Sequence, residues 1–551
     1  MKKLLLLGGS AQQIVAIETA KQLGYYTVLC DYLPDNPGQF VADKFYLVST
    51  TDKDAVLDVA RKEEIDGVLA YASDPAAPTA AYVAERLGLP GNPYESVEIL
   101  SNKDRFRAFL EEHDFCTPKA KAYTCSEDVI ADLKSGVFSF PVILKPVDSS
   151  GSKGVARVDD LDGVEEKLSC AMDYSRSKRL IVEEFVEKYG YQIAGDGLSI
   201  DGRLVFRLFG NDHFDPQGVN PFVPISASFP YNMPAWVHDK IHSEIQRLLT
   251  LLHMGSCTYN FDIRIDKDYN VYLMEIAPRD GGNYIPQVIK HLTGVDLVEY
   301  SVRLAMGERV EAPQAVTPTG FASYYAVHSN QDGVLAGIDI AEDFYRDHIL
   351  KAFHIKPAGT EVHAFRGANT ALGCYLMRFD NMDQMLDLMD HSENWISVRL
   401  KDKHDVIIEK LEDSHAIKQL LLEFAPYFPS VCTSEMPSVC EKLTKYGNIL
   451  FMKHQDTVIG FAAFYANNHT TGIAYLSLIA ITETYQKKGL GRMLLDRVCE
   501  YSLREGMKKL QLKVRKDNLS ALKFYESYGF RALATDCGED LFFLLDKNLV
   551  M

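Results

Sequence analysis

Two carboxylates in a short hairpin have the spacing of a metal site. Apolar segments flank a polar turn at residues 267–270, and a symmetrical turn places Asp262 opposite Glu275 and Ile263 opposite Met274. Carboxylates directly opposite each other in a sheet repel, so we expect a divalent cation between them. Ligands that offer only oxygen favour Mg²⁺ or Mn²⁺. The alternative is a pair of solvated acids on an exposed face.

A loop rich in glycine and serine joins two predicted strands between Lys145 and Gly154. Its backbone N–H groups can approach phosphate oxygens without obstruction from side chains. Lys145 and Lys103 supply positive charge for the phosphates, although a flexible turn and a solvated lysine are the alternatives. The loop residues expected to contact a nucleotide are Ser149, Ser150, Gly151, Ser152 and Gly154.

A second anion site is indicated near the C-terminal end of the sequence. The predicted strand Leu476–Ile481 runs into Gln486-x-x-Gly489-x-Gly491, and a helix with an apolar stripe follows. Successive backbone amides at the start of a helix suit a pyrophosphate.

These segments divide the chain into four predicted domains. Residues 1–115 alternate strand and helix signals, which predicts a parallel sheet. Residues 116–310 are richer in strands, residues 311–402 read as a mixed α+β cap, and a last domain spans 405–551. The fold class expected is therefore a multidomain α/β and α+β protein.

The first turn, Gly8-Gly9-Ser10, resembles part of a dinucleotide fingerprint, because Asp31 ends the second predicted strand. The remaining glycines of G-x-G-x-x-G are absent, so a structural turn is favoured over NAD binding. The P-loop pattern G-x-x-x-x-G-K-[ST] is absent as well.

Composition excludes several classes of function. The net charge of −18 over 551 residues argues against nucleic-acid binding. Ten cysteines show no C-x-x-C pair, which predicts reduced thiols and a cytoplasmic protein. No apolar run reaches the length of a membrane span, and Leu4–Leu7 is too short for a signal peptide.

Residues 1–400 resemble the ATP-grasp superfamily of carboxylate–amine ligases. The resemblance rests on Lys103, Lys145, the loop 149–154, Asp262 and the segment Glu275–Arg279, together with Glu183, Glu184, Phe185 and Val186. It implies a parallel-sheet domain before a two-lobed ATP-grasp fold with a cap. The segment 183–186 would lie along adenine, and Asp262 and Glu275 would hold Mg²⁺.

Two positions depart from the ATP-grasp pattern. A further metal ligand, often Asn, is Ala277 here, and Asn260 on the facing strand is a candidate substitute. The acid that usually contacts ribose is Gln192, whose amide can still bond a hydroxyl. These departures concern ligase activity more than nucleotide binding.

The resemblance also implies the chemistry. A substrate carboxylate attacks the γ-phosphate of ATP, and an amine then displaces phosphate to form an amide, while the protein positions the groups and neutralises charge. Arg279 would clamp the transferring phosphate, and the loop 213–226 would close the site. Substrate contacts are expected from Ser10, Asp74, Arg279, Gly281, Gly282 and Asn283.

Residues 405–551 resemble the GNAT N-acetyltransferases, through Gln486–Gly491, Asn518, Tyr525 and Gly529-Phe530. The likeness implies acetyl-CoA binding, with Asn518 on the pantetheine arm and Tyr525 protonating the departing thiolate. A core aromatic is the alternative for Tyr525, and Glu483 is a weak candidate base. The acetyl-CoA contacts expected are Leu478, Ile479, Ala480, Gln486, Lys487, Lys488, Gly489, Leu490, Gly491, Asn518 and Tyr525.

The sequence thus predicts a bifunctional enzyme that uses ATP, Mg²⁺ (or Mn²⁺) and acetyl-CoA on small carboxylate and amine substrates. One alternative is an acetyltransferase whose ATP-grasp part only senses a metabolite, and another is an NAD-dependent reductase. Assembly as a homodimer stays open.

Overall fold

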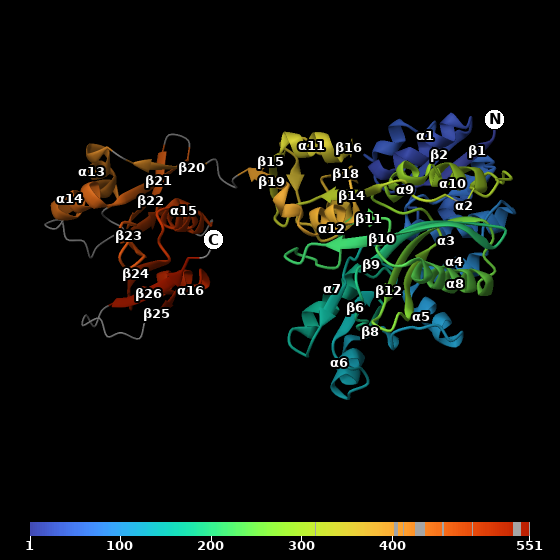
Figure 1. Ribbon diagram of the computed structural model, residues 1–551, viewed down its shortest axis with the longest axis horizontal. Coiled ribbons are helices and arrows are strands. Elements are labelled where there is room, and N and C mark those ends of the chain that lie inside the picture. The colour runs from blue at the N-terminus through green and yellow to red at the C-terminus, as the bar shows by residue number, and fades with distance from the viewer. Residues whose placement is uncertain are drawn as a thin grey trace. The chain divides into compact units, whose positions relative to one another are not determined.

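The chain divides into two compact units, Met1–Leu400 and Lys401–Met551 (Figure 1). The computed structural model describes residues 1–314, 316–401, 406–411, 413–424, 436–454, 457–486, 489–532 and 542–549. Each unit has its own sheets and core, and each is described by itself below.

The N-terminal unit begins with a parallel sheet in the order β3-β2-β1-β4. The strands are β1 (Lys3–Leu7), β2 (Tyr26–Asp31), β3 (Lys44–Leu47) and β4 (Gly67–Leu69). Leu4–Leu7 are all buried, as expected of a strand covered on both faces. The helices of this region are α1 (Ile14–Gln22), α2 (Lys53–Glu63), α3 (Ala77–Leu87), α4 (Tyr94–Ser101) and α5 (Lys103–Glu112). The parallel sheet that the sequence predicted is present.

A small lobe follows, formed by an antiparallel sheet in the order β5-β8-β6-β7. Its strands are β5 (Ala120–Tyr123), β6 (Val142–Pro146), β7 (Ala156–Val158) and β8 (Leu180–Glu184). Two helices, α6 (Ser126–Lys134) and α7 (Val164–Tyr174), complete it. The glycine-rich loop connects β6 to β7, so this lobe carries the predicted phosphate contacts.

The largest sheet has eight antiparallel strands in the order β13-β12-β9-β10-β11-β14-β18-β16. They are β9 (Gln192–Ile200), β10 (Arg203–Phe214), β11 (Pro224–Phe229), β12 (Cys257–Ile265), β13 (Val271–Ala277), β14 (Phe321–Val327), β16 (Ile349–Phe353) and β18 (Gly373–Phe379). The helices packed on it include α8 (Ala235–Leu251), α9 (Ile285–Thr293), α10 (Leu297–Ala305) and α12 (Met382–Asp390).

Strands of the predicted cap segment therefore continue the sheet that carries the metal-site hairpin. The rest of that segment forms α11 (Glu342–His348) and a three-stranded sheet, β17-β15-β19, from β15 (Gly333–Ile340), β17 (Glu361–Val362) and β19 (Ile396–Lys401). The predicted loop 213–226 is shorter than expected, because its ends extend β10 and β11 and leave only residues 215–223 irregular. Pairing between β10 and β11 satisfies the backbone groups at both ends.

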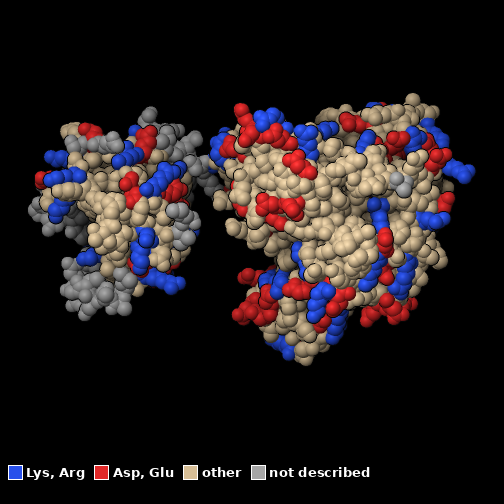
Figure 2. Space-filling view, viewed as in Figure 1, with Lys and Arg blue, Asp and Glu red and all other residues tan. Residues whose placement is uncertain are grey.

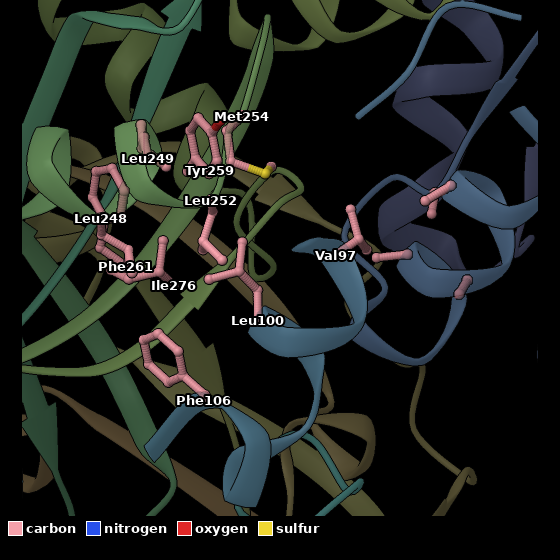
Figure 3. Close-up of a cluster of buried hydrophobic side chains, with 14 of the residues drawn as sticks. Val97, Leu100, Phe106, Leu248, Leu249, Leu252, Met254, Tyr259, Phe261 and Ile276 are labelled. Atoms are coloured by element: carbon pink, nitrogen blue, oxygen red, sulfur yellow. The ribbon is translucent and has the colours of Figure 1, made fainter. Parts of the chain in front are cut away.

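One hydrophobic core joins the N-terminal helices to the large sheet (Figure 3). Leu100 and Phe106, from α4 and α5, lie with Leu252 beyond α8 and with Phe261 and Ile276 of the hairpin. Phe261 pairs with Ile276, and each is the chain neighbour of one of the two carboxylates, Asp262 and Glu275. Because Phe261 and Ile276 point into the core, the two carboxylates point the other way, toward the small lobe.

The C-terminal unit has a seven-stranded sheet in the order β20-β21-β22-β23-β24-β26-β25. Its strands are β20 (Val406–Leu411), β21 (Asn448–His454), β22 (Thr457–Tyr465), β23 (Ile473–Ile481), β24 (Lys509–Arg515), β25 (Arg531–Ala532) and β26 (Phe542–Asn548). Its helices are α13 (Ser414–Glu423), α14 (Met436–Tyr446), α15 (Leu490–Arg504) and α16 (Leu519–Ser527). No helix among the described residues has the length and apolar character of a membrane span.

Substitution of a buried and of an exposed phenylalanine should change the stability of the N-terminal unit by very different amounts. Phe261→Ala should destabilise the N-terminal unit by about 3–5 kcal/mol, because it opens a cavity beside the hairpin. Phe40→Ala should change stability by less than about 0.5 kcal/mol, since Phe40 is 83% exposed. Urea unfolding followed by tryptophan fluorescence measures both, because Trp236 and Trp395 lie in this unit. Equal midpoints for the two variants would contradict this account of the core.

Candidate functional site

The two hairpin carboxylates are paired as the turn predicted. Asp262 lies opposite Glu275. Both line a cavity of about 520 Å³ between the small lobe and the large sheet, which we call the nucleotide cavity. The pairing of Ile263 with Met274 was wrong, because a bulge shifts the register and Ile263 pairs with Leu273. The bulge adds one residue to β13, so Met274 and Glu275 both reach the cavity.

The charges at this pair favour a cation. Burial raises the pKa of Asp262 to about 6, with Glu275 adding to the shift and Arg264 opposing it. Asp262 Oδ1 is buried without a hydrogen-bond partner among the described residues. Burial and then Asp262 raise the pKa of Asp212, a third acid in the same cavity. A buried carboxylate oxygen without a donor fits a hard divalent cation.

The protein supplies only part of a coordination shell. Within the described residues no group of three or more His, Cys, Asp or Glu side chains is arranged to hold a metal. Asp262 and Glu275 therefore suit a cation that also takes oxygen ligands from a bound phosphate and from water, as Mg²⁺ does in nucleotide sites.

The glycine-rich loop lies across the cavity. Ser149, Ser150, Gly151 and Ser152 line it, whereas Gly154 does not. Gly151 and Gly154 have φ angles of +66° and +72°, which favour glycine. Lys103 joins the loop to the hairpin, because its Nζ donates to Ser149 O at 2.8 Å and lies 3.3 Å from Glu275 Oε2.

Lys145 takes part in a buried ion network. Its Nζ lies 2.7 Å from Glu183 Oε2, and Arg107 Nε lies 3.0 Å from Glu183 Oε1. Burial alone would raise the pKa of Glu183, but Arg107 and Lys145 outweigh burial and hold it below its ordinary value. Burial lowers the pKa of Lys145 to about 8, although Glu183 opposes this. Glu183 thus positions Lys145 beside the cavity.

The other residues of the predicted adenine segment do not all face the cavity. Phe185 lines the cavity, while Glu184 accepts from the Ser139 backbone at 2.9 Å. Val186 contributes its carbonyl, which accepts from Arg264 at 3.0 Å. Gln192 lines the cavity and accepts from Arg264 Nε at 2.8 Å. Arg264 therefore orients both the segment and Gln192.

Arg107 and Arg264 are site residues that the sequence analysis missed. Arg107 follows Lys103 by one helical turn, and Arg264 follows Asp262 by two residues on one strand, so each shares a face with a predicted residue. His213 and Asp390 also line the cavity, joined by a 2.7 Å contact between His213 Nδ1 and Asp390 Oδ1. Nothing local in the sequence links this last pair.

Among the six predicted substrate residues, Asp74 alone lines the cavity described above or the smaller one beside it, and Arg279 contacts Asp74. Arg279 Nε donates to Asp74 Oδ1 at 2.7 Å. Asp74 and Glu275 line a second cavity of about 200 Å³, which we call the substrate cavity. It also contains Lys103, Ser149 and Ser150, so it continues from the nucleotide side of the loop.

The loop after Arg279 is held by buried contacts. Gly281 N donates to Asp196 Oδ2 at 2.9 Å, and a Cβ at Gly281 would lie 2.6 Å from Asp196 Oδ1. The Asn283 backbone donates to Gln12 at 2.9 Å, and a Cβ at Gly282 would meet the same side chain. Gly281 is thus required for close packing.

The first turn is structural in its contacts. Ser10 is exposed, and its hydroxyl donates to Gln13 at 2.9 Å. Asp31 accepts from the Gly9 backbone at 2.7 Å and from the Leu33 backbone at 2.8 Å. One Asp31 oxygen therefore holds the turn and the other holds the segment after β2, which supports the structural interpretation over a dinucleotide fingerprint.

Asn260 lies opposite Ala277, as the register predicted. Its amide nitrogen donates to Asp196 Oδ1 at 2.9 Å and to Gly195 O at 3.2 Å. These bonds fix the carboxamide against β9. The Asn260 amide nitrogen is thus bound to β9, and Asp196 in turn accepts from Gly281 N in the loop after Arg279.

The C-terminal unit contains an opening between two parallel strands. β23 and β24 pair from Ile473 to Leu476, and no pairing continues beyond that point along their described residues. A bulge at Ser477 shifts the register of β23 against β22. The predicted acetyl-CoA contacts Leu478, Ile479 and Ala480 follow this bulge, so their backbone lies where the strands separate.

The pyrophosphate segment joins this opening to α15. Gln486 Nε2 donates to Ile481 O at 2.9 Å, and Gly489 takes a φ of +84° just before Leu490 begins the helix. A Cβ at Gly491 would approach nothing nearer than 3.7 Å. The predicted contacts Lys487 and Lys488 lie outside the described residues.

Two further predicted residues lie on α16. Asn518 accepts from the Ala521 backbone at 3.0 Å, so its carboxamide oxygen caps the helix. Tyr525 is 8% exposed and burial raises its pKa, which keeps the phenol protonated. Glu483 begins a short 3-10 turn, Glu483–Tyr485, after β23.

Substitution of two adjacent glutamates tests whether the buried ion network stabilises the N-terminal unit. Glu183→Gln should destabilise the N-terminal unit by about 3–5 kcal/mol, because two buried cations lose their counter-charge. Glu184→Gln should have an effect below about 1 kcal/mol, since its only described side-chain bond is to one backbone amide at the surface. Urea unfolding checks both, and similar losses would contradict the role given to Glu183.

Comparison with known proteins agrees with the two units. Residues 416–530 match the model of the acetyltransferase (GNAT) family. The carbamoyl phosphate synthase large chain of Clostridium botulinum is 24% identical over 299 residues, which cover 53% of this chain and 27% of that protein. A formate-dependent phosphoribosylglycinamide formyltransferase of Sulfolobus acidocaldarius is 26% identical over 328 residues, covering 58% and 79%. The chain thus spans about a quarter of the carbamoyl phosphate synthase sequences it matches.

Solved structures give the fold of the N-terminal unit. An L-amino acid ligase from Bacillus licheniformis superposes with a TM-score of 0.60 at 21% identity, covering 73% of this chain and 99% of that one. A phosphoribosylglycinamide synthetase from Anaerococcus prevotii gives 0.57 at 20% identity, covering 73% and 100%. The N-terminal unit therefore has the ATP-grasp fold, and residues 416–530 match the acetyltransferase (GNAT) family.

Proposed function

We propose that the protein is a bifunctional enzyme, an ATP- and Mg²⁺-dependent carboxylate–amine ligase joined to an acetyl-CoA-dependent N-acetyltransferase. The observation that carries the ligase proposal is the facing pair Asp262 and Glu275 beside Lys103 and Lys145 in one cavity. Lysines and carboxylates lining the same cavity suit a nucleoside triphosphate with its metal.

Each residue has a role that follows from its contacts. Lys145, held by Glu183, and Lys103, held at the loop by Ser149 O, would neutralise phosphate oxygens. Asp262 and Glu275 would hold Mg²⁺, which when bound neutralises charge on the transferring phosphate. Phe185 would pack along the base.

The reaction proposed has two steps. A substrate carboxylate attacks the γ-phosphorus of ATP, which forms an acyl phosphate and releases ADP. An amine then attacks the acyl carbon, so that an amide forms, phosphate leaves, and the amine loses a proton. The substrate cavity, between Asp74 and Glu275, adjoins the phosphate end of the nucleotide cavity and supports placing both steps there.

The acetyltransferase proposal rests on the separated strands of the C-terminal unit. The backbone of Leu478–Ala480 would pair with the pantetheine arm, and the amides from Gly489 into α15 would hold the pyrophosphate. Tyr525 would donate its proton to the departing thiolate while an amine takes the acetyl group.

A cytoplasmic location completes the proposal. The cysteines whose side chains are described are all free thiols, which suits a reducing compartment. On the face seen in Figure 2, acidic and basic side chains are interspersed, as on many proteins that act on small molecules.

Two aspartates of the same hairpin test the metal role. Asp262→Asn should lower Mg²⁺-dependent ADP release by about 100-fold or more, because one of two metal ligands is lost. Asp268→Asn, at the exposed turn, should retain the wild-type rate. ADP release is measured with a panel of carboxylates and amines. Equal rates in both variants would overturn the metal assignment.

The same assay separates the ligase from a metabolite sensor. ATP binding by the full chain without ADP release for any carboxylate would support the sensing alternative, which Ala277 and Gln192 motivate. In that outcome the N-terminal unit would act by binding alone.

Tyr525→Phe tests the second site. Acetyl transfer to a responsive amine should slow by about 100-fold, because the leaving thiolate loses its proton donor, while CoA affinity is retained. Tyr446→Phe is the control, since Tyr446 is 54% exposed. Free thiol release measures the rate and calorimetry measures CoA binding. A wild-type rate for Tyr525→Phe would assign Tyr525 to packing.

A further inference from the structure

A third cavity, of about 560 Å³, lies between the glycine-rich loop and the segment 363–370. We call it the cap cavity. Neither the nucleotide nor the substrate cavity contains the residues of this segment. The polar side chains that matter to its chemistry are Lys153, Arg176, His363, Arg366, Asn369 and Thr370.

The walls of the cap cavity are tied together. Asn220 Nδ2 donates to Ser152 O at 2.9 Å and to Arg366 O at 3.0 Å, so one amide joins the loop to the cap. Gly367 allows their close approach, because a Cβ there would lie 3.3 Å from Gly151 O. The shape of the cavity therefore depends on backbone contacts that a change of the Arg366 side chain leaves in place.

Two cations of the cap cavity have no acidic partner among the described residues. Lys153 and Arg366 form no ion pair with any residue that the structure describes. Arg176 donates to the carbonyl of Asp148 rather than to a carboxylate.

The acids of the cap cavity have partners of their own. Asp148 accepts from Ser175 Oγ at 2.9 Å and from Ser177 N at 2.8 Å. Asp332 accepts from the Ala364 backbone at 2.9 Å and lies 3.8 Å from His363 Nδ1. The cavity is lined by the cations Lys153, Arg176 and Arg366 and by the acids Asp148 and Asp332, so its net charge is positive and attracts an anion.

The cap cavity reaches the reacting end of the nucleotide site. Ser149 and Ser150 line all three cavities, and Asp148 and Arg176 line both the cap cavity and the substrate cavity. A molecule with one end beside Glu275 can therefore place its other end toward Arg366.

We infer that the cap cavity binds an anionic group, a carboxylate or a phosphate, carried by the amine substrate. The inference rests on the proposed ligase function and narrows its substrate class. The amine that displaces phosphate would also carry an acidic group, and Arg366 would be a specificity residue for that group. Lys153 lines both the nucleotide and the cap cavities, so Arg366 is the cleaner position to change.

A binding experiment tests the cavity without turnover. The full chain is saturated with Mg²⁺ and a non-hydrolysable ATP analogue, and then titrated in a calorimeter with inorganic phosphate, succinate or uncharged succinamide. At least one anion should bind the wild type while succinamide does not, and Arg366→Gln should weaken that binding by about tenfold or more. Arg346→Gln, a change at an exposed cap arginine paired with Asp347, should bind as the wild type.

The two anions distinguish a phosphate group from a carboxylate. Equal binding by wild type and Arg366→Gln would overturn the inference, as would failure of both anions to bind while the ATP analogue does. ADP release then gives an independent result, in which Arg366→Gln raises KM for acidic amines and leaves kcat unchanged. Anion binding without any ADP release would instead refute the ligase and keep the anion site.

Discussion

The site of the N-terminal unit depends on one buried carboxylate. Glu183 lies between Lys145 and Arg107, which come from β6 and α5, while Glu183 itself belongs to β8. Two cations held together in a poorly polarisable interior repel strongly unless a counter-charge lies between them. Arg107 also donates to the carbonyls of Leu273 and Met274, so the same network reaches the metal-site hairpin.

The charges that line the cavity are only partly paired within the protein. Lys145 pairs with Glu183, and Lys103 lies 3.3 Å from Glu275. Asp262, by contrast, keeps a buried oxygen without a donor among the described residues. The charge that completes the site is therefore expected from a ligand and its metal rather than from the protein.

Features set by local pattern were predictable from the sequence. The strand Leu4–Leu7 and the pairing of Asp262 with Glu275 follow from periodicity and from one turn. The bulge at Met274 was not predictable, because it satisfies Arg107, a residue distant in sequence.

The other features that the sequence did not predict depend on contacts between residues far apart in the chain. His213 and Asp390 meet only because α12 packs beside β10, and no spacing in the sequence encodes that contact. The division of the cap segment between two sheets has the same cause, since strand partners are chosen by tertiary packing. Arg264, by contrast, was recoverable from its alternation with Asp262 along β12.

The bulge makes chain length, rather than residue type, a determinant of the site. Removing Met274 would give β13 a regular alternation in which Leu273 still faces the core and Glu275 still faces the cavity. The hairpin would keep its register, but one of the two carbonyls that hold Arg107 would be gone. A single inserted residue thus gives a hairpin that pairs its acids a second carbonyl with which to hold Arg107.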